Sequence, residues 1–158
     1  MNEMERILDQ MERIHVGNPW TNRPFTTLLE AVTHIQAAAK PIEDSHSIWE
    51  IVLHLITAQE LIVDLVRGEM RPYEPGDEWP AVIDASDAAW QETVDRFFAG
   101  DAEVREVVAY GVPEMELDEP LQEGGSSAYN NLHGYIQHAA YHGGQISMLK
   151  RLTEGDGA

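Results

Sequence analysis

The stretch IWEIVLHLITAQELIVDLV, residues 48–66, decides the fold class of this chain. Its apolar residues form two adjacent stripes at helical spacing, with almost no strand-like alternation. Ser47 and Glu50 form an S-x-x-E capping box before it, and Gly68 follows it. We therefore predict a helix over residues 47–68. Because two stripes exceed the single face that a surface helix buries, this helix is expected to be central or also to face a second subunit.

Two further long helices are predicted toward the ends of the chain. Residues 3–15 carry apolar residues at helical spacing, and Asn2 is positioned to cap them. The last helix begins after Ser126 or Ser127 and has basic residues in its final turns, where they complement the helix dipole. Residues 153–158 are expected to be a frayed tail.

A fourth long helix is predicted from Asp84 to near Gly111, with Gly100 and Asp101 as a weak point where a kink is possible. Between the long helices the sequence predicts connections that contain additional short helices. Pro24 and Pro41 limit the length of one or two of these.

The connection over residues 71–83 carries three prolines and reads as a loop. It also contains Tyr73 and Trp79, whose rings are expected to pack over the helices.

Four long helical segments without a convincing strand predict an all-α fold, a four-helix bundle. A length of 158 residues is about that of one ordinary domain, so residues 1–158 are expected to form a single domain.

Composition excludes several classes of function. The chain has 28 Asp and Glu against 10 Lys and Arg, a formal charge of -18, so it repels phosphate backbones and nucleic acid is not expected as a partner. There is no basic start followed by an apolar stretch, and no apolar run long enough to span a membrane, so a cytoplasmic location is expected. With no cysteine, the chain offers no disulfide, thiolate ligand or thiol nucleophile.

Three histidines form the strongest candidate site. His138 and His142 are one helical turn apart and project from the same face, so both can reach one ion. His54 lies on an apolar stripe of the helix over residues 47–68 and can meet them across the bundle. Three neutral nitrogens leave the charge of a divalent ion uncompensated and leave coordination positions open, as in catalytic rather than structural sites.

The simpler interpretation is that these are ordinary core histidines, because H-x-x-x-H also occurs by chance. The remaining histidines are interpreted as structural or solvated: His15, His34, His46 and His133. Glu50 is better explained by capping than by catalysis. Gln145 and Tyr141 are possible neighbours of His142 but receive no catalytic assignment. Ala139 stands where zinc proteases carry their glutamate, which disfavours proteolysis of that type.

The segments YIQHAAYHGGQISMLKR, residues 135–151, and HSIWEIVLHLI, residues 46–56, resemble the DinB-like family of metal-dependent proteins. The resemblance implies a four-helix bundle, a His54, His138 and His142 triad that binds zinc, nickel or a similar dication, and a homodimer. The family name implies no contact with DNA. Gly143 departs from many relatives, which have Arg at this position, so any anion pairing by that residue is missing here.

Family members of known chemistry include enzymes that use low-molecular-weight thiols, whose thiolate the metal can activate. We therefore expect a metal-dependent enzyme acting on a small molecule, by thiol-dependent S-transfer or by hydrolysis with metal-bound water. A thiol would have to be a cosubstrate, because the chain has no cysteine. The alternatives are a noncatalytic binding or stress-response protein stabilised by the metal, and a metal-free helical dimer whose three histidines belong to the core.

Overall fold

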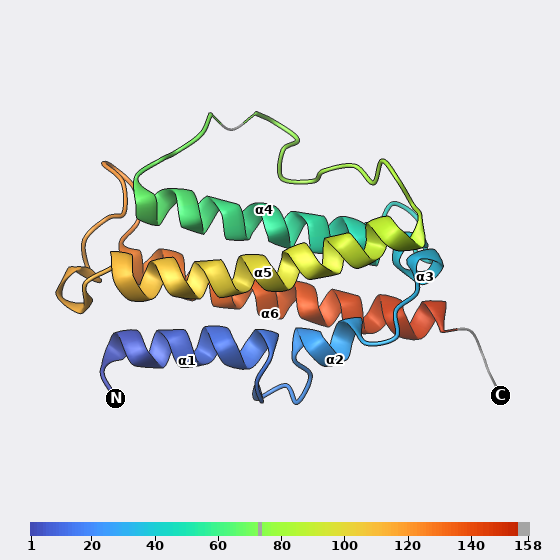
Figure 1. The fold of residues 1–158 in the computed structure, drawn as a ribbon, viewed down its shortest axis with the longest axis horizontal. Helices are drawn as coiled ribbons and strands as arrows, with labels where there is room; N and C mark the ends of the chain where they lie inside the picture. Colours follow the sequence, from blue (N-terminus) through green and yellow to red (C-terminus); the bar gives the residue numbers. More distant parts are fainter. Residues whose placement is uncertain (73, 155–158) are drawn as a thin grey trace.

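The computed structural model describes residues 1–72 and 74–154, and Tyr73 and the end of the predicted tail lie outside this part of the chain. The described residues form six α-helices and a short 3-10 helix, and no strand (Figure 1). The expected all-α class is confirmed. The helices are α1 (Glu3–His15), α2 (Phe25–Leu29), α3 (His34–Ala38), α4 (Ile48–Arg67), α5 (Asp87–Gly111) and α6 (Ala128–Thr153), with the 3-10 turn at Glu114–Glu116.

The four long helices lie side by side, and each contacts two of the others. α4 packs against α5 and α6, and α1 packs against the same two helices from the opposite side. The chain direction in Figure 1 shows that α4 and α5 run the same way and that α6 runs opposite to both. The connection over residues 68–86 therefore has to return along the whole length of α4 before α5 begins.

Local capping explains where the long helices begin and end. Asn2 and Glu5 form the capping box of α1, and Ser47 with Glu50 forms that of α4. Gly68 ends α4 with φ at 69°, in the left-handed region that glycine adopts without strain. At α6 the cap is Ser127. α5 is capped by Ser86 and starts three residues after the predicted Asp84.

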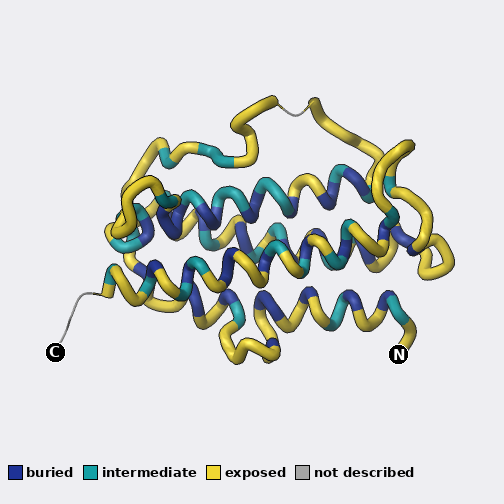
Figure 2. The backbone as a smooth tube through the Cα atoms, turned by 180° about the vertical axis from the view of Figure 1, so that it is seen from behind, coloured by how far each residue is buried: buried dark blue, intermediate teal, exposed yellow. Residues whose placement is uncertain are grey.

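The core contains two apolar clusters, one at each end of the bundle. Along α4 the first cluster includes Ile56 and the second begins with Ile62, and buried Gln59 lies between them. Along α5 buried Asp101 lies in the corresponding gap. The buried stripes of the long helices face one another, while their outer faces are exposed (Figure 2). A layer of polar side chains thus interrupts the apolar core.

This polar layer joins side chains from all four long helices. The Nδ1 atom of His15 lies 2.9 Å from the Asp101 carboxylate, and Arg105 donates to the same carboxylate at 3.1 Å. The Tyr135 hydroxyl lies 3.4 Å from Nε2 of His15. Gln59 donates to the carbonyl of Phe97 at 3.1 Å.

Gly100 fits closely against the Gln59 side chain, because a Cβ atom at this position would lie 2.3 Å from its amide oxygen. The helix α5 continues through Gly100 and Asp101 without interruption. Close packing, and not a break in the helix, explains this glycine.

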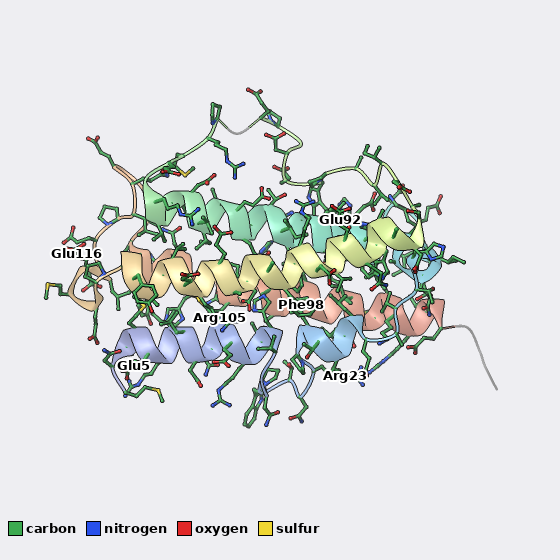
Figure 3. All side chains as sticks on the ribbon, viewed as in Figure 1. Glu5, Arg23, Glu92, Phe98, Arg105 and Glu116 are labelled. Carbon is green, nitrogen blue, oxygen red and sulfur yellow. The ribbon has the colours of Figure 1, made fainter. Side chains whose placement is uncertain are left out.

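The outer surface is strongly acidic. Glu5, Glu92 and Glu116 are exposed and project from different elements in Figure 3. The acidic residues that give the chain its formal charge of -18 therefore include many solvated side chains.

No helix in the described part of the chain is both long enough and apolar enough to cross a membrane.

Candidate metal centre

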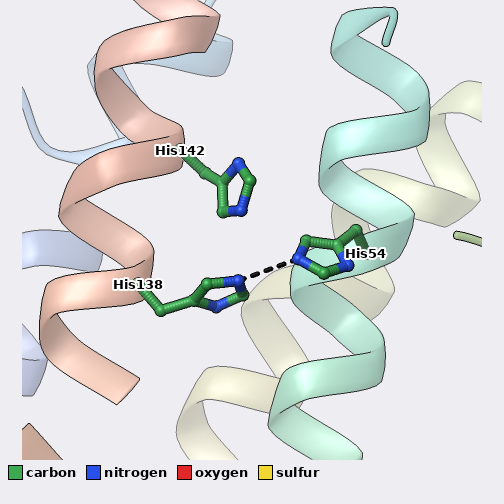
Figure 4. A group of neighbouring side chains, drawn as sticks. All are labelled: His54, His138 and His142. Carbon is green, nitrogen blue, oxygen red and sulfur yellow. Dashed lines mark hydrogen bonds between the residues drawn. The ribbon is translucent and has the colours of Figure 1, made fainter. Parts of the chain in front are cut away.

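The three histidines singled out from the sequence come together between α4 and α6 (Figure 4). His54 projects from α4, and His138 and His142 project from one face of α6. One nitrogen from each ring lies within 4.8 Å of the other two. The closest pair, Nε2 of His54 and Nε2 of His138, is 2.8 Å apart. The four-residue spacing in α6 and the antiparallel packing of α4 and α6 produce this cluster.

Two of the rings are oriented through their other nitrogen. Nδ1 of His54 lies 2.5 Å from the backbone carbonyl oxygen of Glu78, and Nδ1 of His142 lies 2.6 Å from the Oε1 atom of Gln145. A carbonyl or amide oxygen can only accept, so both Nδ1 atoms carry the proton. The Nε2 lone pairs of His54 and His142 are then directed into the cluster, where that of His54 accepts a hydrogen bond from Nε2 of His138. A bound cation would replace this hydrogen bond, as in metal sites whose histidines are held by a second hydrogen bond.

The protonation state also favours a cation. Burial lowers the pKa of His138 to about 4, and the neighbouring His142 and His54 add to this effect. Burial likewise lowers the pKa of His142, against the opposing effect of the hydrogen bond with Gln145. At neutral pH these two imidazoles are therefore neutral, which is the form that ligates metals.

The loop between α4 and α5 covers one side of the cluster. The indole ring of Trp79 stacks on His54, with ring centroids 4.0 Å apart and planes 7° apart. His46 stacks on the other face of the same indole, with a centroid distance of 3.5 Å. The prediction that the loop aromatics pack over the helices is confirmed for Trp79. Tyr73 lies outside the described residues, so the same expectation for its ring stays a prediction.

The donor set fits a divalent ion. Ligands bound at about 2.0–2.1 Å to one zinc ion lie roughly 3.0–3.4 Å from one another. The His54–His138 separation is already close to this range, and rotation of the partly exposed His54 and His138 side chains can bring their nitrogens toward that of buried His142. No carboxylate belongs to the cluster among the described residues, so an ion would keep its full charge.

Three other residues singled out in the sequence, Glu50, Tyr141 and Gly143, lie near the histidines but do not belong to the cluster. Glu50 caps α4 and pairs with Lys40 at 2.8 Å. Burial acts to raise its pKa, but Lys40 and the backbone N–H of Ser47 hold the value below the usual range. Tyr141 is 66% exposed, with its ring nearly perpendicular to that of His142. Gly143 faces away from the cluster, against Phe25 and Leu28.

Sequence reasoning missed two parts of the site. His46, for which the sequence predicts only a structural or solvated role, contacts the cluster indirectly through Trp79. The carbonyl of Glu78 orients His54, and no sequence pattern marks a backbone acceptor in a loop. Of the other histidines, buried His15 belongs to the polar layer, and His34 lies 3.4 Å from Asp87. His133 packs beside Tyr129.

Fold and site together define an all-α protein with an intramolecular histidine triad between two antiparallel helices. A family model described as the DinB superfamily matches residues 20–146, which include the whole triad and Gln145. The chain belongs to the DinB superfamily. No curated protein and no solved structure gave a match.

Proposed function

We propose that the chain is a metal-dependent enzyme that acts on a small molecule, with His54, His138 and His142 as ligands of one divalent ion, zinc or nickel. The observation that carries the proposal is the convergence of three imidazoles, two of which have Nδ1 held by an oxygen and Nε2 directed inward. Two packed helices that hold no metal ion need no such orientation of their histidine rings. The cytoplasmic location and the homodimer expected from the sequence belong to the same proposal.

The chemistry follows from the number and charge of the ligands. A divalent ion on three neutral ligands acts as a Lewis acid with open positions and lowers the pKa of a bound water or thiol. The residues of the chain hold and orient the ligands, and Trp79 keeps solvent from one face of His54. Glu50 does not serve as a base in this proposal, because its carboxylate is engaged by Lys40 and by the cap of α4.

Two reactions of the small molecule are compatible with such a site, thiol-dependent S-transfer and hydrolysis. In S-transfer an added low-molecular-weight thiol supplies the nucleophile, since the chain has no cysteine. In hydrolysis the nucleophile is water. A strict requirement for added thiol in turnover of a model electrophile would identify the first, and turnover without thiol the second.

Metal content measured by mass spectrometry on untagged protein tests the site itself. We expect about one ion per chain in wild type, and its loss in His54→Ala, His138→Ala and His142→Ala, each confirmed as folded by circular dichroism. His133→Ala on α6 is the matched control and should keep the ion. Wild-type protein that holds no ion after reconstitution with zinc and nickel would refute the proposal and favour a histidine-containing structural bundle.

A further inference from the structure

A pocket of about 340 Å³ opens beside the triad, between α4 and α6. His54 and His138 both line it. From there it follows α4 toward Leu65 and α6 back toward Asn130, so it extends along the bundle from the candidate ion site. A molecule bound to an ion at the triad would therefore have its remaining atoms in this pocket.

The walls of the pocket are largely apolar. Ala58, Leu61, Ile62 and Leu65 form the α4 side, and Leu61 remains 38% exposed. On the α6 side the ring of Tyr135 contributes apolar surface, because its hydroxyl is directed at His15 in the polar layer. A ligand with an apolar body would bury surface here.

Apart from the two imidazoles, the described residues that line the pocket include no acidic and no basic side chain. This contrasts with the groove between α4 and α5, where Arg67, Arg71 and Arg96 each pair with a carboxylate. A charged group carried into the apolar pocket would lose its hydration without gaining a partner. The neutral polar groups are Thr57, Asn130 and Asn131, which suit a hydroxyl or an amide.

We propose that this pocket binds the body of an uncharged, largely apolar organic substrate, whose one metal-binding group reaches the triad. The proposal rests on the proposed function and deepens it by naming the substrate class. The observations that support it are the two triad histidines in the pocket wall and the uncharged lining.

Gly134 offers a way to fill the pocket. It lies on α6 in the pocket lining, and a Cβ atom at this position would meet nothing within 4 Å. Gly144 on the same helix is equally open but lines a different pocket, on the side of Arg23 and Phe25. Gly134→Leu and Gly144→Leu are thus matched variants, both with improved helix propensity, and only the first occupies the proposed site.

The experiment measures binding of three hydroxamic acids to zinc-loaded protein by calorimetry. Acetohydroxamic acid carries the metal-binding group alone, benzohydroxamic acid adds an apolar body, and 4-carboxybenzohydroxamic acid adds a charge to that body. We expect benzohydroxamic acid to bind about tenfold more tightly than acetohydroxamic acid, since its ring leaves water for an apolar wall. The added carboxylate should remove this gain.

Two variants, Gly134→Leu and then Leu61→Arg, locate the effect in the pocket, with Gly144→Leu as the control. Gly134→Leu should abolish the tenfold advantage of the ring and leave acetohydroxamic acid unchanged, whereas Gly144→Leu should alter neither. Leu61→Arg, at an exposed position that tolerates a charge, should reverse the order and favour the carboxylated probe. This second variant keeps the test independent of how Gly134→Leu folds.

The outcomes separate this inference from the proposed function. If zinc itself does not bind, the proposed function fails. If zinc binds but the three probes bind equally, or Leu61→Arg leaves their order unchanged, the substrate class is overturned. A self-association that Gly134→Leu disrupts, without any dependence of probe binding on the body, would assign the groove to a second copy of the chain and also overturn the proposal.

Discussion

At the scale of single residues, the candidate site depends on groups that touch the histidines and not only on the histidines themselves. Gln145 accepts from Nδ1 of His142 at 2.6 Å and so fixes the direction of Nε2. Outer partners of this kind commonly contribute between one and two orders of magnitude to metal affinity. The arrangement makes Gln145 a positioning residue.

Gln145→Ala is therefore expected to weaken zinc affinity by roughly 10- to 100-fold, with the protein still folded. Competition with a chromophoric chelator measures the change. Gln137→Ala, the same substitution at an exposed position of α6, is the control and should bind zinc as wild type does. Equal affinities of the two variants would contradict the positioning role.

The low pKa of His138 leads to a pH prediction for the metal-free protein. Burial, His142 and His54 lower this pKa from 6.5 to about 4 in the folded chain. Between these two values the unfolded chain binds a proton that the folded chain does not, so the free energy of unfolding increases with pH over this window. His138→Gln should remove this part of the pH dependence.

Urea unfolding in the presence of a chelator, at about pH 4.5 and about pH 7, measures the difference. Wild type should gain more stability between these two pH values than His138→Gln does. His133→Gln serves as the control for the loss of a histidine on the same helix. Identical gains in wild type and His138→Gln would show that His138 titrates normally.

At the scale of elements, the long connection between α4 and α5 is part of the site. It returns along α4 because α4 and α5 run in the same direction (Figure 1), and it brings Glu78 and Trp79 onto His54. A short hairpin between antiparallel helices would not pass the triad. The parallel arrangement of α4 and α5 thus supplies one wall of the candidate centre.

Trp79 should report on metal binding through its fluorescence. Its ring stacks on His54 at 4.0 Å, and nickel or cobalt ions quench indoles held next to them. We expect nickel to quench a substantial part of the tryptophan emission of wild type, and this part to be missing in Trp79→Phe. Trp20→Phe is the control, since Trp20 is fully exposed and outside the cluster. Quenching that is the same in Trp79→Phe and wild type would contradict the contact.

Elements were predicted well where the signal is local. The ends of α4 were predicted to within one residue. The signals were the capping box of Ser47 and Glu50, the apolar stripes after it, and Gly68. The spacing of His138 and His142 likewise follows from one helix. The convergence with His54 needed the packing of α4 on α6, which a helical pattern alone does not determine and which the family resemblance supplied.

At the scale of the whole molecule, the polar layer was the feature that sequence patterns did not reveal. His15, Gln59 and Asp101 belong to three different helices, and each alone reads as an ordinary polar residue. Only their burial between the two apolar clusters gives them a shared environment. Contacts between elements distant in sequence have no local signature, so neither the layer nor the position of the loop over His54 could be predicted.

Breaking this layer should be costly. Asp101 is fully buried and faces both His15 and Arg105, so Asp101→Ala leaves buried polar groups without their partner. We expect a loss of about 3 kcal/mol in the free energy of unfolding. Asp95→Ala on the exposed face of α5 should change it by less than about 0.5 kcal/mol. Urea denaturation gives both values, and equal effects would mean that the layer contributes no specific stability.

The triad also joins distant parts of the chain: His54 and His138 are 84 positions apart in a sequence without cysteine. An ion held by both would act as a reversible cross-link, whose stabilisation comes mainly from restricting the unfolded chain. Amide hydrogen exchange should then slow in α4 and α6 on adding zinc, and change less in α1, which supplies no ligand. Local opening of the bundle would in this way depend on how much metal the surroundings provide.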